Sequence, residues 1–169
     1  MMISEFDGKK PKIARSAFID PSAVIIGDAE IEGDVSVWPC AVIRADVERI
    51  KVGRGANVQD CAVLHPNRNK PVIIGEGVTV GHCAVVHGSM VGKNSLIAMN
   101  ATVIDSEIGD YCLIGAGCVI TPGSKIPSRS LVLGLPHKIV RQLSEEEIKA
   151  LEKSEKDYIE LKSLYEAVK

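Results

Sequence analysis

Aromatic residues are scarce in this 169-residue chain, at 4% of the sequence, although hydrophobic residues as a whole make up 46%. A compact globular core normally depends on a few large rings. A core built from small aliphatic side chains therefore indicates a narrow, repetitive interior. The length suits a single domain, residues 1–169, with a sizeable core.

Other absences narrow the range of functions. The net charge is only -2 and no run of lysine and arginine stands out, which argues against a nucleic-acid or anionic-membrane surface. No apolar stretch approaches the ~20 residues of a membrane span, and the first residues lack the apolar segment of a signal peptide. The five cysteines include no CxxC pair, so free thiols are expected. We therefore expect a cytoplasmic protein without nucleic-acid or membrane partners.

An aliphatic residue recurs at every sixth position from Ile13 to Ile126, with a few slips. A small residue usually stands four places after it, where it would fit a tight corner. In such hexapeptide repeats each repeat makes one short strand and one corner, and three repeats close a triangular coil whose parallel strands stack about 4.8 Å apart. A β-sandwich would show period two and hairpin turns instead. The pattern predicts a β-solenoid over about residues 12–133, with the aliphatic residues pointing inward as ladders.

The chain changes character after the repeat. Gly134 to Lys138 (GLPHK) is interpreted as a turn leading out of the solenoid, and Ser144 and Glu147 have the spacing of a capping box. Apolar residues then follow at helical spacing: Ile148, Leu151, Tyr158, Leu161, Tyr165 and Val168. This predicts a C-terminal helix over about residues 144–168, with a role in packing rather than in chemistry.

Three of the four histidines lie within residues 58–88, and the repeat determines where each one points. Arg44, His65 and His87 each follow a ladder residue by one place, in repeats that are one full coil apart. We expect them to form one column on one face of the prism. Two imidazoles in one column are within reach of a single metal ion.

His82 has a different position in its repeat and belongs to another face, in register with Asp60. It cannot easily reach His65 and His87 within one chain, but a neighbouring chain can supply it. If three prisms pack side by side, the same contact brings Arg44 against Asp60, and a closed cyclic trimer is the simplest symmetry that completes it. A lone histidine is usually a surface or core residue, whereas three histidines with an open fourth position are typical of catalytic zinc.

The residues resemble those of the gamma-class carbonic anhydrases over nearly the whole chain. The resemblance is carried by Arg44 and Asp46 in IRAD, by Asn57, Gln59 and Asp60 in NVQD, by His65 in VLH, and by His82 and His87 in GHCAVVHG. It implies a left-handed parallel β-helix assembled as a homotrimer, with a metal at each subunit interface. The residue matching His82 would come from the adjacent subunit.

The resemblance also implies a reaction, the reversible hydration of CO₂ to bicarbonate by a metal-bound hydroxide. The three histidines would bind Zn²⁺, with Fe²⁺ or Co²⁺ as alternatives that this ligand set does not separate. Gln59 would hydrogen-bond the hydroxide or orient the substrate, with Asn57 as a weaker candidate for the same work. The structural charges at the interface would be Arg44, Asp46 and Asp60.

Two positions depart from the best-characterised members of that family. The loop Pro66 to Pro71 (PNRNKP) has no acidic residue, whereas those members carry a proton-shuttling glutamate there. Val47 stands where a second active-site glutamate is usual, and Glu48 would point to the other side of a strand. Because the acidic proton shuttle is absent, we expect slow turnover.

Two other functions stay open. GLPHK resembles a G-x-P-A-K turn of hexapeptide-repeat acyl-CoA transferases and thioesterases, with His137 where alanine is usual, and a catalytic histidine in such enzymes acts as a general base. A non-catalytic metal-binding trimer is the other alternative. A column of Cys40, Cys61 and Cys83 could form a thiolate site or a disulfide, but small apolar packing is the favoured interpretation.

Overall fold

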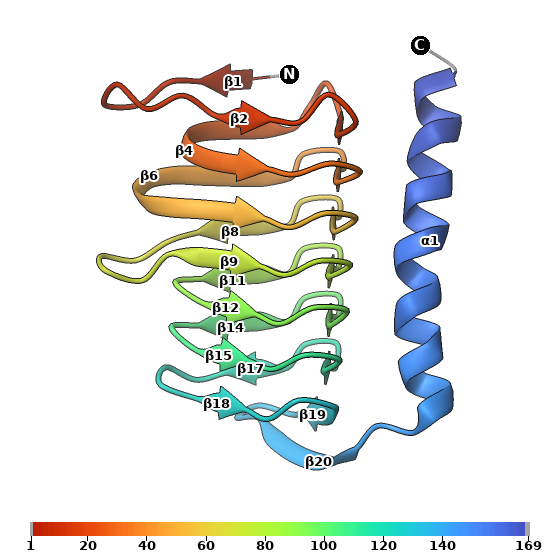
Figure 1. The fold of residues 1–169 in the computed structure, drawn as a ribbon. Helices are drawn as coiled ribbons and strands as arrows, with labels where there is room; N and C mark the ends of the chain where they lie inside the picture. Colours follow the sequence, from red (N-terminus) through yellow and green to blue (C-terminus); the bar gives the residue numbers. More distant parts are fainter. Residues whose placement is uncertain (1, 168–169) are drawn as a thin grey trace.

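Short strands stack into a triangular β-solenoid of about seven turns, and one long helix lies along its side (Figure 1). The computed structural model describes residues 2–167. This architecture confirms the predicted parallel solenoid with a C-terminal helix.

Strands of successive coils pair in parallel on three faces of the prism. Face 1 contains β1 (Met2–Ser4), the first parts of β4 (Val24–Ile31) and β6 (Val42–Val52), β8 (Val63–His65), β11 (Val85–His87), β14 (Thr102–Ile104) and β17 (Val119–Ile120). Face 2 contains β2 (Lys12–Ile13), the second parts of β4 and β6, β9 (Val72–Ile74), β12 (Met90–Val91), β15 (Glu107–Ile108) and β18 (Lys125–Ile126). Face 3 contains β3 (Phe18–Ile19), β5 (Ser36–Val37), β7 (Asn57–Val58), β10 (Thr79–Val80), β13 (Leu96–Ile97), β16 (Leu113–Ile114) and β19 (Ser130–Leu133), with β20 (Lys138–Gln142) at its end.

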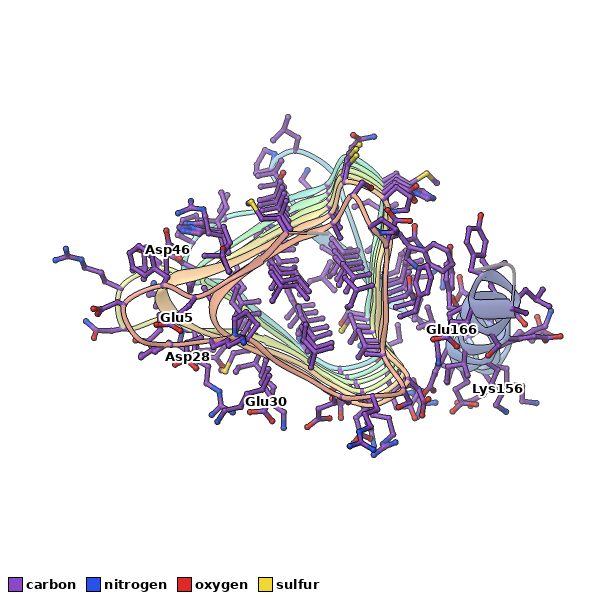
Figure 2. All side chains as sticks on the ribbon, turned by 90° about the horizontal axis from the view of Figure 1, so that it is seen from above. Glu5, Asp28, Glu30, Asp46, Lys156 and Glu166 are labelled. Atoms are coloured by element: carbon purple, nitrogen blue, oxygen red, sulfur yellow. The ribbon has the colours of Figure 1, made fainter. Side chains whose placement is uncertain are left out.

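The repeated aliphatic residues point into the prism, as predicted. Ile43, Leu64 and Val86 lie in register on β6, β8 and β11, and all three are completely buried. Figure 2 looks down the prism and shows such side chains stacked in rows inside the triangle. Each row removes apolar surface from water at every coil, which is the main favourable contribution to folding.

The backbone turns at each corner of the prism one residue before the small side chain that was expected to occupy the corner. The residue three places after a ladder residue adopts left-handed backbone, with φ of 59° at Cys40, 59° at Cys61 and 58° at Cys83. The small residue that follows, such as Ala62 or Ala84, is buried and fills the corner from inside. The three cysteines themselves are exposed, so the interpretation of their column as small apolar packing is wrong.

The solenoid is longer at both ends than the repeat predicts. At the start, β1 pairs with β4 in parallel, ahead of the expected boundary at residue 12. At the other end, the GLPHK segment leads into β20, which returns antiparallel to β19. Neither strand belongs to a hexapeptide repeat, which is why the period did not reveal them.

The helix α1 (Glu145–Ala167) begins at the predicted capping box. The backbone nitrogen of Ser144 donates to Glu147 Oε2 at 2.8 Å, and the backbone nitrogen of Glu147 donates to Ser144 Oγ at 3.2 Å. The Arg141 guanidinium, together with these bonds, lowers the pKa of Glu147 to about 2. The predicted end of the helix, with Val168, lies outside the described residues.

The helix docks on face 3 and runs back along the prism (Figure 1). Ile148 and Leu151 form an apolar cluster with face 3, and the Tyr165 ring meets Trp38 at 5.1 Å between centroids. The predicted stripe is wrong at Leu161, which is 38% exposed, while the neighbouring Lys162 is buried. Among the described residues, no helix has the length and hydropathy that a membrane crossing needs.

The ladder interpretation predicts that Ile114→Ala destabilises the fold strongly. Ile114 lies on β16 and is completely buried, so truncation should cost about 2–5 kcal/mol. Urea unfolding followed by circular dichroism measures this loss. Glu107→Ala, on the exposed side of β15, is the control and should shift stability by less than about 0.5 kcal/mol. Equal midpoints for the two variants would contradict the ladder interpretation.

Candidate metal centre

His65 and His87 form the predicted column on face 1. Each residue ends its strand, and the two are paired in register across β8 and β11. Their ring centroids lie 5.3 Å apart. Two imidazoles at this separation, on adjacent strands of a rigid sheet, are within reach of one metal ion.

His65 is held by two charges on β6. Arg44 forms an ion pair with Asp46, and Asp46 Oδ1 lies 3.1 Å from His65 Nε2. Burial lowers the pKa of His65, and the positive charge of Arg44 lowers it further, against the opposing effect of Asp46. The neutral imidazole is therefore favoured, and this is the form that binds metals.

The predicted contact of Arg44 with Asp60 would join two chains, so it stays a prediction. Within the chain, Arg44 pairs with Asp46 instead. Burial raises the pKa of Asp46, but the hydrogen bonds from Arg44 and His65 outweigh this, and the net shift is downward. Asp46 therefore stays charged beside His65.

His82 stands apart from the other two histidines, as its place in the repeat predicts. It lies in the corner after β10, and its Nδ1 is 2.8 Å from Asp60 Oδ2. Within the part of the chain that the structure describes, no group of three or more His, Cys, Asp or Glu side chains could hold a metal ion. One chain brings two of the three predicted ligands together and leaves the third elsewhere.

Asn57 and Gln59 lie on the His82 side of the molecule and not beside His65 and His87. Both are buried on face 3, where Asn57 Nδ2 donates to Thr79 Oγ1 at 2.9 Å. Gln59 Nε2 donates to Asn57 Oδ1 at 3.0 Å and to the Tyr158 hydroxyl at 2.7 Å. The two amides are thus fixed in orientation, and Gln59 is the direct neighbour of Asp60.

Tyr158 is a residue of this region that the sequence did not reveal. Helical spacing placed it in an apolar stripe, but its hydroxyl accepts a hydrogen bond from Gln59. Burial raises the pKa of Tyr158, and the charge of Asp60 raises it further, so the phenol stays neutral. The helix therefore contributes a polar group on the His82 side as well as packing.

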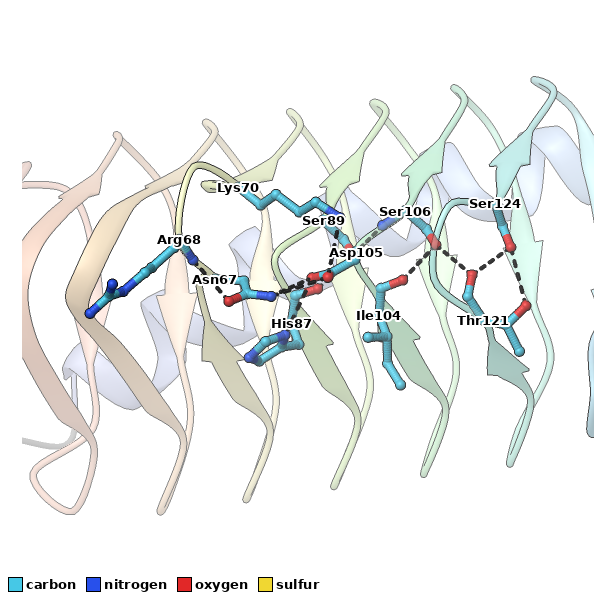
Figure 3. A network of polar contacts seen from close by, with 10 residues as sticks. All are labelled: Asn67, Arg68, Lys70, His87, Ser89, Ile104, Asp105, Ser106, Thr121 and Ser124. Carbon is cyan, nitrogen blue, oxygen red and sulfur yellow. Dashed lines mark hydrogen bonds and ion pairs between the residues drawn. The ribbon is translucent and has the colours of Figure 1, made fainter.

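Asp105 is a second residue that the sequence did not reveal. It lies in the corner after β14, with Oδ1 3.5 Å from His87 Nδ1 (Figure 3). Burial raises its pKa, but hydrogen bonds from Lys70 and Asn67 lower it by more, so the carboxylate stays charged. No spacing in the sequence connects this residue with His87, because the contact depends on how two corners stack.

The three histidines share one feature, an aspartate at one ring nitrogen. The pairs are Asp46 with His65, Asp60 with His82, and Asp105 with His87. Carboxylates in this position fix the tautomer and orientation of histidines that bind metals. The donor set therefore fits a divalent metal, provided that a second chain brings its His82 to the pair on face 1.

Comparison with solved structures supports the fold. A structure described as a putative acetyltransferase of Bacillus cereus is 38% identical, with a TM-score of 0.97, and the match covers 99% of this chain and 98% of that one. No family model matches the chain.

Comparison with curated relatives supplies the family. The chain is 43% identical to a carbonic anhydrase of Geobacillus kaustophilus, over 99% of this chain and 92% of the relative. It is 36% identical, over 97% of its length, to the mitochondrial gamma carbonic anhydrase 2 of Arabidopsis thaliana, of which the match covers 61%. With these identities and the motif residues in place, the chain belongs to the gamma carbonic anhydrase family.

Proposed function

We propose that this protein is a metal-dependent carbonic anhydrase that converts CO₂ and bicarbonate reversibly at a site shared between the chains of a homotrimer. The observation that supports it most is the division of three carboxylate-supported histidines between two regions of one chain. Such a ligand set becomes complete only when one chain presents His65 and His87 to His82 of another. Relatives named carbonic anhydrases support the reaction.

The metal would be Zn²⁺, with Fe²⁺ or Co²⁺ compatible with the same ligands. When bound by three imidazoles with an open position, such an ion supplies hydroxide near neutral pH. The protein's own part is to keep the imidazoles neutral and oriented. Asp46 and Asp60 would do this from one ring nitrogen of their histidines, at 3.1 Å from His65 Nε2 and 2.8 Å from His82 Nδ1, which leaves the other nitrogen as the ligand atom.

Gln59 is the residue that would orient the nucleophile. Its Nε2 donates to Asn57 Oδ1 and to the Tyr158 hydroxyl, and among residues 2–167 no group donates a hydrogen bond to its Oε1. An amide oxygen can only accept hydrogen bonds, so Oε1 held in place would orient the O–H bond of a hydroxide and with it the direction of the hydroxide lone pairs. Asn57 acts indirectly, by holding Gln59.

The proton released by the reaction has no dedicated carrier in the loop after His65. The basic group Lys70 and the amide of Asn67 are both bound to Asp105, and the loop contains no free acid. Val47, where related proteins have a glutamate, is exposed and cannot carry a proton. Proton transfer to dissolved buffer would therefore limit turnover.

Mixed trimers test whether the site is shared. His82→Ala and His87→Ala should each abolish activity alone, because each removes a ligand from every site. Coexpressed with two different affinity tags and purified on both, mixed trimers should regain about one third of the wild-type metal content and activity, since one of their three interfaces is complete. Mixed trimers as inactive as either parent would contradict a shared site.

The role of Gln59 predicts that Tyr158→Phe lowers kcat/KM for CO₂ hydration by about fivefold, because one anchor of the amide worth about 1 kcal/mol is lost. Stopped-flow measurement with a pH indicator gives the rate. Tyr165→Phe is the control, since Tyr165 also packs on Trp38 but is 49% exposed. If the two variants lose activity equally, the amide network does not assist the reaction.

Turnover should depend on buffer. We expect kcat to rise severalfold as imidazole buffer is increased at constant pH and ionic strength, whereas kcat/KM stays constant, because only proton transfer involves the buffer. Introduction of an acid, Asn69→Glu, should reduce this dependence. A kcat independent of buffer would show that the protein carries its own proton relay.

The rival activity is acyl transfer or thioester hydrolysis with coenzyme A as the carrier, and the Bacillus cereus structure is described as a putative acetyltransferase. Hydrolysis of acetyl-CoA by the metal-loaded protein, unaffected by His82→Ala, would favour it over CO₂ hydration. A trimer that contains metal and has neither activity would favour the non-catalytic alternative.

A further inference from the structure

Asp105 occupies one of two shortened corners of the solenoid. The repeats from Val86 to Val91 and from Val103 to Ile108 are each one residue short. At the resulting corners, Gly88 has φ 54° and Asp105 has φ 45°. The strands pair so that Asp105 stacks directly on Gly88, the residue that follows His87.

Gly88 leaves the space that the Asp105 carboxylate fills. A Cβ atom at Gly88 would lie 2.3 Å from Asp105 Oδ1 and 3.1 Å from Asn67 Cβ. Such a contact is too close for any residue with a side chain. The carboxylate thus approaches the histidine strand at a point where only glycine permits it.

The loop between β8 and β9 holds the carboxylate from its other side (Figure 3). Asn67 Nδ2 donates to Asp105 Oδ2 at 3.1 Å and lies 3.4 Å from Oδ1, and Lys70 Nζ donates to Oδ2 at 3.2 Å. Two backbone hydrogen bonds between Asn67 and Lys70 close the loop. Oδ2 is therefore occupied by the loop, and Oδ1 is the oxygen that faces His87.

We propose that Asp105 is a positioning residue for His87, and that the loop of residues 66–71 acts through Asp105 to hold this histidine as a metal ligand. The proposal rests on the proposed function in taking His87 as a ligand. Oδ1 lies 3.5 Å from His87 Nδ1, which is longer than a good hydrogen bond, so the proposal takes the two atoms to approach by a few tenths of an ångström. The proton then stays on Nδ1 and leaves Nε2 for the metal.

Holding Asp105 gives the loop a role that its composition alone does not indicate. A loop without acid cannot shuttle protons, but an amide and an ammonium group are the donors needed to hold a carboxylate that is only 13% exposed. The insertion follows His65 in the chain and supports His87 through space. It therefore links both ligands of face 1 to one loop.

Asp105→Asn tests the proposal through metal affinity. We expect zinc affinity, measured by competition with a chelator, to fall about 10- to 100-fold while circular dichroism is unchanged. Lys70→Met should give a smaller loss, and should add little to Asp105→Asn because the two act in one chain of contacts. The matched control is Lys125→Met, since Lys125 pairs with Glu107 and should leave affinity unchanged.

A second readout requires neither metal nor turnover. In metal-free protein labelled with ¹⁵N-histidine, we expect the His87 ring to carry its proton on Nδ1, and Asp105→Asn or Lys70→Met to shift it toward Nε2. Wild-type affinity in Asp105→Asn together with an unchanged tautomer would overturn the proposal. If instead CO₂ hydration is absent but these two readouts respond, the proposed function fails and the positioning role stands.

Discussion

The inward ladder of aliphatic side chains is the constraint on which the rest of this structure depends. Because a ladder residue at every sixth position must be buried, the direction of each residue between two ladder positions is determined. Residues one place after the ladder, such as His65 and His87, emerge on the same face at successive coils. The spacing of the coils then sets the distance between the two imidazole rings, and no other local feature is needed to bring them together.

Departures from the repeat fall along one edge of the prism. The extended β6, the loop of residues 66–71 and the two shortened corners at Gly88 and Asp105 all lie between faces 1 and 2. This is the edge beside His65 and His87. The regular coils provide rigidity. The irregular corners bring charged groups close to the histidines, whereas regular corners would keep these charged groups at a distance. Function and irregularity therefore coincide, as expected where local rules are broken for a site.

The sequence predicted what the six-residue period controls, and also the capping box that begins the helix. It predicted the inward ladder, the column of His65 and His87 and the separate place of His82, because all three follow from counting. It did not reveal Tyr158, whose bond to Gln59 joins residues 99 apart in the chain, since that depends on where the helix docks. It also did not reveal Asp105, which meets a loop residue 38 places earlier. Contacts of this kind are set by corners and docking, which carry no period.

The distribution of polar groups suggests why assembly and activity would be linked in this protein. One region carries the histidine pair with its loop, and the other carries His82 with Gln59 and Tyr158. In a shared site, the groups that would orient the nucleophile come from the same chain as the third ligand, so a His65–His87 pair without a neighbouring chain lacks both together. The helix that carries Tyr158 also packs on Trp38 and buries Lys162. The position of Gln59 therefore depends on the docking of the last part of the chain, which makes completion of the fold a further condition for a working site.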